Sequence, residues 1–212
     1  MVSVSLGTCW RVLMDKQIAK VFPTLVNGYT LQSVKDNLDA IIENINSVNS
    51  HHAGEYGSFT LDQNLLENDI YLEVKKEIIT CVNDYTSLLK HNVQDVKIVS
   101  SWANKLEKQE HIQPHSHSNS YVCGVIHLSN GGDLMLRRPD IADMFTLVSD
   151  YEKHDDMFFR VPAFAGQLVL FPSKLIHSVL SHNDNITRYS IAFNTWPTKY
   201  GVPTGMVDLN NK

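Results

Sequence analysis

The strongest constraint on the fold is a change in the spacing of apolar residues near residue 92. Before that point, two stretches carry apolar residues every three or four positions, which is the period of an amphipathic helix. The first stretch begins at Thr30 and ends at a polar run, Asn49 to Gly57, and the second runs from Ile70 to Leu89. We therefore expect two helices to fill much of the first half of the chain.

After Asn92 the sequence consists of short β-prone runs separated by turn residues, with no helical period between them. This pattern favours an all-β sandwich, jelly roll or barrel over a parallel α/β sheet. An acidic stretch from Pro139 to Asp156 interrupts the runs, and we interpret it as an insertion loop that covers one mouth of the barrel. The expected strands span residues 96–103, 121–128, 133–137, 167–171, 176–180 and 188–194.

The chain has 212 residues and a mass of 24.0 kDa, which is the size of one domain. No repeat, low-complexity tract or linker divides it. We expect a single domain over residues 1–212, with a helix-rich N-terminal support at 1–92, a β core at 93–200 and a tail at 201–212.

Charge and cysteine content exclude several functional classes. The net charge is −5, so no overall electrostatic attraction favours nucleic acid or an anionic membrane surface. The N-terminal sequence lacks the basic region of a secretory leader, and no window reaches the roughly 18 apolar residues of a membrane span. Three cysteines without a C-x-x-C pair argue against a disulfide framework or a thiolate zinc site. We expect a cytoplasmic protein.

Two histidines two positions apart raise the question of a metal site. His115 and His117 would point to the same face of an extended strand, so both could bind one cation without distorting the backbone. His177, at the start of a later strand, is the natural third ligand, and neutral imidazoles suit iron, zinc, copper or nickel. The alternative is that an H-x-H pair occurs by chance at a strand edge, where histidine is a tolerated polar residue.

A second signal lies near the end of the chain, where residues 188–194 alternate between polar and apolar side chains. Arg188 and Ser190 therefore point in the same direction. A guanidinium inside a barrel requires an anion, and its planar fork binds a carboxylate through two hydrogen bonds, to which a serine hydroxyl can add a third. An anionic co-substrate would supply that partner, and a salt bridge to an acidic side chain of the protein is the alternative.

Taken together in chain order, these motifs resemble those of the iron(II)- and 2-oxoglutarate-dependent oxygenases. More narrowly, they are similar to a branch of that superfamily found in bacteria and their phages, and the similarity extends from Trp102 to Asn194, about half of the chain. The motifs are His115-x-His117, Gly124-Val125-Ile126-His127-Leu128, Gln167-Leu168-Val169-Leu170-Phe171-Pro172-Ser173, His177 and Arg188-x-Ser190-x-x-Phe193-Asn194.

The resemblance implies a mainly β fold with a double-stranded β-helix core, the jelly roll also found in cupins, supported by N-terminal helices. It implies that Fe(II) is held by His115, His117 and His177, and that Arg188 binds the distal carboxylate of 2-oxoglutarate with help from Ser190. The superfamily usually has H-x-D where this chain has His117. We favour ligation by His117 over its replacement by Asp133 or water, because both histidines of the pair share a face.

Four further side chains are candidates for the cavity. Asn104 follows Trp102 in a W-x-N segment and could contact co-substrate or substrate, with an ordinary turn asparagine as the alternative. Tyr121 could contact 2-oxoglutarate, although packing in the core is the alternative reading. Asn194 has the same parity as Arg188 and is expected to point inward. His127 stands where the branch has a tyrosine; it could be a polar residue of the pocket, and we favour the alternative, a core histidine with its hydrogen bonds satisfied.

The implied function is a dioxygenase that uses O2, hydroxylates a C–H bond and releases succinate and CO2. The alternative is a non-oxidative, cupin-like binding module, although cupins place a glutamate where this chain has Tyr121 and Val122. A structural protein with vestigial histidines is a third reading. We expect the substrate to be a protein side chain or a small molecule, not nucleic acid, in the cytoplasm of a bacterium or of a phage's host. The sequence leaves open whether the chain forms a homodimer.

Overall fold

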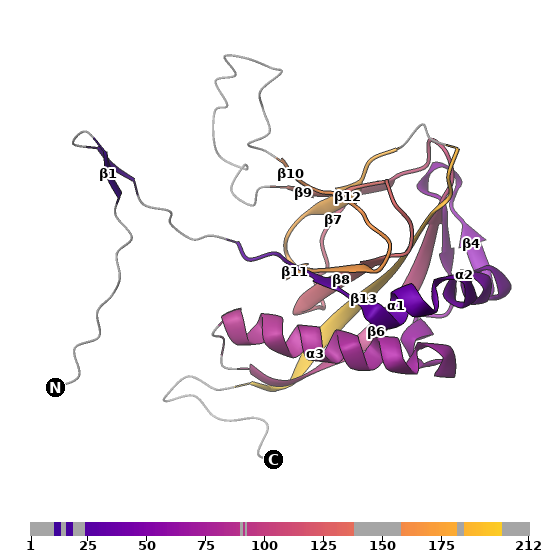
Figure 1. Ribbon diagram of the computed structural model, residues 1–212, viewed down its shortest axis with the longest axis horizontal. Coiled ribbons are helices and arrows are strands. Elements are labelled where there is room, and N and C mark those ends of the chain that lie inside the picture. Colours follow the sequence, from indigo (N-terminus) through magenta and orange to yellow (C-terminus); the bar gives the residue numbers. More distant parts are fainter. Residues whose placement is uncertain are drawn as a thin grey trace.

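The computed structural model describes residues 11–13, 16–18, 24–89, 91, 93–137, 158–181 and 185–200. Three sets of antiparallel strands are present: a sheet of seven strands, a sheet of four strands and a separate pair, β1 and β2 (Figure 1). The predicted insertion loop and the predicted tail lie outside the described residues. The strands are β1 (Arg11–Leu13), β2 (Lys16–Ile18), β3 (Asn27–Thr30), β4 (Ser50–His52), β5 (Ser58–Thr60), β6 (Val93–Leu106), β7 (Ile112–His115), β8 (Val122–His127), β9 (Leu134–Arg137), β10 (Phe158–Val161), β11 (Gln167–Pro172), β12 (His177–Val179) and β13 (Arg188–Tyr200).

The two larger sheets face one another and enclose a shared apolar core. Their strand orders are β3-β11-β8-β13-β6-β5-β4 and β10-β9-β12-β7. Val125 and Phe171 of the seven-stranded sheet belong to the same buried cluster as Leu136 and Val179 of the four-stranded sheet. Because every pairing within these sheets is antiparallel, two such sheets packed face to face form the predicted jelly-roll core.

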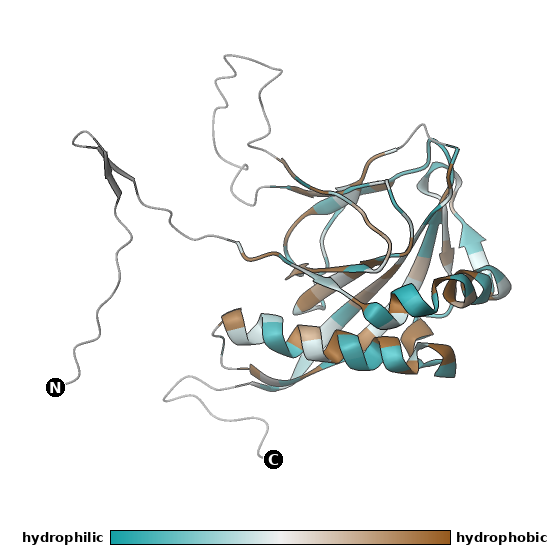
Figure 2. Cartoon of the chain, in the orientation of Figure 1, coloured by the Kyte–Doolittle hydropathy of each residue, from teal (hydrophilic) through white to brown (hydrophobic). Residues whose placement is uncertain are grey.

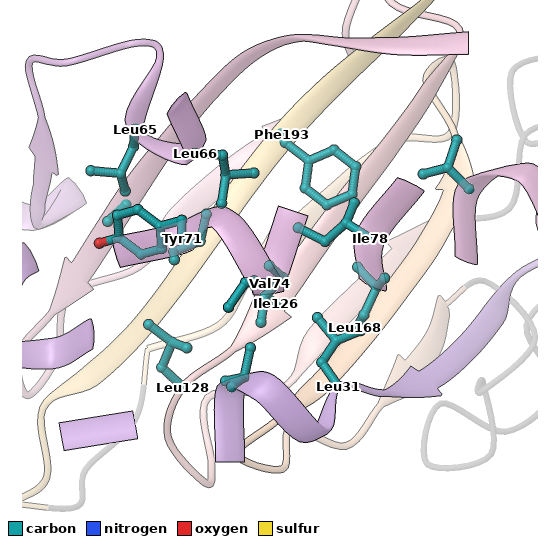
Figure 3. Close-up of a cluster of buried hydrophobic side chains, with 14 of the residues drawn as sticks. Leu31, Leu65, Leu66, Tyr71, Val74, Ile78, Ile126, Leu128, Leu168 and Phe193 are labelled. Atoms are coloured by element: carbon teal, nitrogen blue, oxygen red, sulfur yellow. The ribbon is translucent and has the colours of Figure 1, made fainter. Parts of the chain in front are cut away.

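Helices cover the opposite face of the seven-stranded sheet (Figure 1). Ile78 of the longest helix is fully buried in the same cluster as Ile126 and Phe193 of the sheet, and Figure 3 shows these side chains together. Figure 2 shows hydrophobic and hydrophilic residues interspersed along this helix, as its predicted amphipathic period requires. The helices are α1 (Gln32–Asp36), α2 (Leu38–Ser47) and α3 (Leu72–Leu89), with short 3-10 turns η1 (Gly54–Tyr56), η2 (Leu65–Glu67) and η3 (Asp69–Tyr71).

The first predicted helix is divided into two. α1 ends at Asp36 and α2 begins at Leu38, with Asn37 between them at φ −122° and ψ 19°. The side chain of Asn37 donates a hydrogen bond of 2.9 Å to the Ser33 carbonyl, which would accept the Asn37 amide in a continuous helix. Asparagine competes with the helical backbone in this way, so the apolar period continues while the helix stops.

The N-terminal half also supplies strands that the apolar period did not predict. β3 pairs with β11 at one edge of the seven-stranded sheet, and β5 pairs with β6 near the other. β4 falls within the polar run that was expected only to end a helix. Each of these strands has three or four residues, which is too short to show an alternating pattern. The N-terminal half therefore contributes strands to the sheet as well as the expected helices.

No helix within the described ranges is long and apolar enough to span a membrane.

Candidate active site

The three predicted histidine ligands come together at the edge of the four-stranded sheet. His177 begins β12 and lies directly opposite His115, the last residue of β7, in the antiparallel register. His117 lies two residues beyond the end of β7, where its backbone amide donates a 2.9 Å hydrogen bond to the Ser173 carbonyl. The same-face argument for an extended strand therefore applies only in part, because the strand ends at His115 and the Ser173 carbonyl holds His117 in place.

The imidazoles are close enough to share one ion. One potential ligand atom from each of the three side chains lies within 4.8 Å of the others. The ring centroids are 4.2 Å apart for His115 and His177, 5.1 Å for His115 and His117, and 5.2 Å for His117 and His177. Since zinc and iron bind imidazole nitrogen at about 2.1 Å, small ring rotations would bring the three nitrogens onto a common metal.

Hydrogen bonds fix which ring nitrogen is available in two of the three histidines. Nδ1 of His115 lies 2.8 Å from the Gln113 carbonyl oxygen, and Nδ1 of His177 lies 2.9 Å from the Leu175 carbonyl oxygen. A carbonyl only accepts hydrogen bonds, so Nδ1 carries the proton and Nε2 presents its lone pair. This arrangement is the usual support of a metal-binding histidine, because it sets both the tautomer and the ring orientation.

Burial keeps two of the three imidazoles, His117 and His177, uncharged near neutral pH. It lowers the pKa of His117 to about 4, with a further contribution from neighbouring His115. It also lowers the pKa of His177 to about 4, and the nearby histidines reinforce this effect against the hydrogen bond to Leu175. Both rings are therefore neutral at pH 7, which is the form that binds a metal ion.

Within the described part of the chain, histidines alone make up this cluster. Asp133, the considered replacement for His117, accepts hydrogen bonds from Arg160 Nε and, at 3.0 Å, from the Ala163 amide. The Asp133 carboxylate therefore forms hydrogen bonds outside the histidine cluster. The donor set fits a metal of borderline softness such as Fe(II), and it supplies no negative charge of its own.

Arg188 is buried at 1% exposure, and its described hydrogen-bond partners are uncharged. Its Nε donates to the Gly132 carbonyl at 2.8 Å, and its Nη1 donates to Ser190 Oγ at 2.9 Å. Across the residues that the structure describes, no carboxylate lies within ion-pair distance of the guanidinium. Burial lowers its pKa to about 10 against the opposing effect of the nearby Asp133 carboxylate, so it remains charged at pH 7.

One cavity joins the histidine cluster to Arg188. It contains about 510 Å³ of empty space, counted out through its open mouth. All three histidines line it, together with Arg188, Ser190 and Asn104. The structure therefore brings together six of the eight side chains that the sequence assigned to the site.

Tyr121 and Asn194 do not line this cavity. The Tyr121 hydroxyl lies 2.9 Å from His91 Nδ1, and its ring packs against the core on the helix side of the sheet, as the alternative reading of this residue held. Asn194 donates to Ser100 Oγ at 3.1 Å and accepts a 3.2 Å contact from the Cys123 thiol, which itself lines the cavity. The side chain of Cys123 therefore separates Asn194 from the cavity.

Two residues near Arg188 have features that the motifs did not reveal. The carbonyl of Gly132 accepts a hydrogen bond from Arg188, and a Cβ at this position would lie 2.4 Å from Arg188 Cδ. His127 was interpreted as a satisfied core histidine. It is fully buried, but neither ring nitrogen has a hydrogen-bond partner among the described residues.

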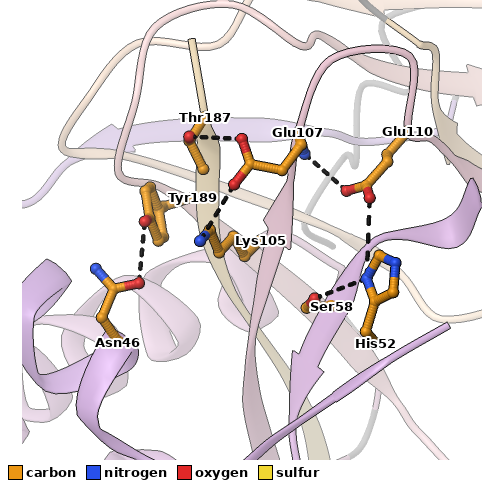
Figure 4. Close-up of polar contacts among 8 residues, drawn as sticks. All are labelled: Asn46, His52, Ser58, Lys105, Glu107, Glu110, Thr187 and Tyr189. Carbon is orange, nitrogen blue, oxygen red and sulfur yellow. Dashed lines mark hydrogen bonds and ion pairs between the residues drawn. The ribbon is translucent and has the colours of Figure 1, made fainter. Parts of the chain in front are cut away.

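Polar groups elsewhere in the fold are paired by the protein itself. Figure 4 shows Lys105 beside Glu107 and the Tyr189 hydroxyl donating to Asn46, at 3.1 and 3.0 Å. These contacts lie at the outer end of β6 and β13.

The fold and the cavity define the class. In comparisons with solved structures, the chain is similar to HygX from Streptomyces hygroscopicus with nickel, 2-oxoglutarate and hygromycin B bound, at 12% identity and a TM-score of 0.61, covering 82% of this chain and 84% of that one. It is also similar to a prolyl-4-hydroxylase from Pseudomonas putida, at 14% identity and a TM-score of 0.58, covering 83% and 94%. At such identities the likeness establishes the jelly-roll fold that 2-oxoglutarate oxygenases share.

The sequence then identifies the family. Residues 100–194 match the family described as "Putative 2OG-Fe(II) oxygenase", a segment that runs from within β6 to within β13 and contains every lining residue named above. The family match agrees with what the motifs predict, and the solved structures agree with the predicted fold. No curated protein sequence matches the chain.

Proposed function

We propose that this protein is an Fe(II)- and 2-oxoglutarate-dependent dioxygenase that hydroxylates a C–H bond of its substrate and releases succinate and CO2. The observation that carries the proposal is the pairing of three clustered imidazoles with a buried guanidinium in one cavity. A diacid of the length of 2-oxoglutarate would meet a metal at one end and Arg188 at the other.

Each side chain has a separate role in this proposal. His115, His117 and His177 hold the metal as neutral ligands, and the carbonyls of Gln113 and Leu175 keep two of the rings in the required tautomer. Arg188 and Ser190 bind the distal carboxylate through charge-assisted hydrogen bonds. Asn104, on the neighbouring strand opposite Ser190, is available to orient the co-substrate or the substrate.

When bound, the iron and the oxo acid would activate O2, which is the oxidant for the C–H bond, and no protein side chain provides this chemistry. The protein itself positions the reactants and keeps water away from them. Apolar side chains such as Val125, Leu134 and Phe171 line the cavity between its polar groups and exclude water from the reacting atoms.

The substrate that we propose is a protein side chain or a small molecule with a C–H bond that can reach the cavity. The net charge of −5 gives nucleic acid no general attraction. We place the activity in a reducing cytoplasm, that of a bacterium or of a phage's host, because the cysteines show no disulfide pattern.

The decisive assay supplies Fe(II), 2-oxoglutarate and O2, and measures succinate by mass spectrometry. Wild-type protein should form succinate, even without substrate, at a slow uncoupled rate. His177→Ala should retain the fold by circular dichroism, bind less than one tenth of the metal and form none. Metal binding without any succinate or 2-oxoglutarate binding would contradict the proposal and favour the cupin-like binding module.

A further inference from the structure

His117 is held differently from the other two histidines of the cluster. Nδ1 of His115 and Nδ1 of His177 each meet a backbone carbonyl, which fixes the orientation of the ring. No hydrogen bond joins the His117 ring to any residue that the structure describes. The Ser173 carbonyl holds only the His117 backbone, through a 2.9 Å hydrogen bond, so this contact leaves the rotation of the imidazole unrestrained.

Trp102 contacts this ring from the opposite sheet. It lies on β6 opposite Ala192 of β13, and both residues line the cavity. The centroids of the Trp102 and His117 rings are 6.0 Å apart, and the ring planes are inclined by 49°. Aromatic rings whose centroids lie about 4.5–7 Å apart in an offset or tilted arrangement attract each other beyond the effect of burial alone.

The place of this contact gives it a consequence for the metal site. Of the rings that contact His117 in the described ranges, that of Trp102 alone belongs to a residue outside the histidine cluster. His115 and His177 belong to the four-stranded sheet, whereas Trp102 faces His117 from the seven-stranded sheet. A bulky ring on that side limits how far the imidazole can rotate away from the other two ligands.

We propose that Trp102 is a positioning residue for the metal: its indole ring holds the His117 imidazole in the orientation that binds the ion. This inference rests on the proposed function, because it takes His117 as a ligand. It deepens that function, because it makes the third ligand depend on the contact between the two sheets. The neighbours that orient a metal ligand typically raise metal affinity about 10–100-fold.

The test is a double-mutant cycle on metal-free protein with Co(II) as the probe. Co(II) binds imidazole, and its visible absorption spectrum reports the coordination geometry. We expect Trp102→Leu to weaken Co(II) binding about tenfold and to change the spectrum of the bound ion. In a His117→Ala background the same substitution should change Co(II) affinity less than about twofold, because the ring that Trp102 orients is absent.

The control variants separate this role from general packing. Trp196→Leu makes the same chemical change at a tryptophan of β13 that is 46% exposed and does not line the cavity, so Co(II) affinity and spectrum should stay unchanged. Trp102→Phe keeps an aromatic ring and should retain most of the wild-type affinity. If Trp102→Leu does not fold, Trp102→Met repeats the test, because its flexible side chain fills irregular space without a ring.

Two results would overturn the inference. One is unchanged Co(II) affinity and spectrum when Trp102 is replaced by leucine or methionine in otherwise wild-type protein. The other is equal weakening by that substitution with and without His117, which would mean that Trp102 does not act through this ring. Wild-type protein that binds no Co(II) would instead contradict the proposed function.

Discussion

Arg188 carries a buried positive charge, and no carboxylate of the described residues lies within ion-pair distance of it. A buried guanidinium without a counter-ion is unfavourable in the free protein, and it becomes favourable when an anion enters. The sequence predicted its direction, because Arg188 and Ser190 share a strand face. It did not predict the missing salt bridge, because the position of every carboxylate depends on the tertiary fold.

Arg188→Met tests this role while it preserves much of the aliphatic stem. We expect the affinity for 2-oxoglutarate to fall about 30-fold or more, since removing one partner of a buried charge pair is unfavourable by about 2–5 kcal/mol. Metal affinity should be unchanged, because the histidines are untouched. Isothermal titration with Ni(II) and then 2-oxoglutarate separates the two, and equal loss of both would refute this division of labour.

Gly132 shapes the same end of the cavity through the absence of a side chain. Gly131 and Gly132 both have positive φ, at 80° and 67°, so alanine at either position is strained by about 1–2 kcal/mol. Only at Gly132 would the new Cβ collide with Arg188; at Gly131 the nearest atom, Ile186 Cδ1, is 3.4 Å away. Two consecutive glycines indicate a turn, but the clash at Gly132 depends on the position of Arg188 in the fold.

We expect Gly132→Ala to weaken 2-oxoglutarate about tenfold or more, because its methyl group displaces the guanidinium. Gly131→Ala should lose similar stability in urea and keep its affinity. If both variants bind 2-oxoglutarate equally well, Gly132 has no part in positioning Arg188.

At the scale of elements, the period of apolar residues predicted α3 well. Val74, Ile78, Val82 and Tyr85 are all buried. The six expected strands of the β core are present, whereas β7 and β10 lie outside the expected ranges. The division between α1 and α2 and the short strands β3 to β5 were not predictable from this period. They depend on one asparagine side chain and on pairing with strands far along the chain.

Gly124 links the sequence motifs to the packing of β8 on β13. It lies opposite Phe193, whose ring would be 2.1 Å from a Cβ at this position. Gly124→Ala should therefore reduce the free energy of unfolding by about 1–3 kcal/mol through overpacking. Gly28→Ala is the control, since its nearest contact would be an ordinary 3.8 Å. Urea unfolding measures both, and equal stability of the two variants would contradict this packing.

For the whole molecule, the buried neutral histidines predict how stability depends on pH. The pKa values of His117 and His177 fall from 6.5 to about 4, and that of His127 falls to about 3. The unfolded chain therefore binds more protons below pH 6.5. The stability from these groups is fully present above pH 6.5 and is lost as the pH falls toward 4.

Urea unfolding of metal-free protein at pH 7, 6 and 5 should show this loss, up to about 1.4 kcal/mol per pH unit for each histidine. His127→Gln should show a shallower dependence, because one titrating group is gone while the carboxylates are the same. An identical pH dependence in both proteins would mean that His127 is not held neutral by burial.

The sequence predicted the composition of the site better than its surroundings. Six of eight assigned side chains line one cavity, because strand parity and turn positions are local properties. The Tyr121 hydroxyl instead lies beside His91, which is 30 positions earlier in the chain. No local sequence pattern encodes a contact over that separation. The expected division into a helix-rich support, a core and a tail stays a prediction.

The most direct test of the account is diffraction at the iron absorption edge from a crystal grown without O2 in the presence of Fe(II) and 2-oxoglutarate. We predict one anomalous peak within about 2.3 Å of a ring nitrogen from each of His115, His117 and His177, with the far carboxylate of the oxo acid against Arg188. A peak that lacks any one of these imidazoles, or Arg188 paired with a protein carboxylate, would contradict it.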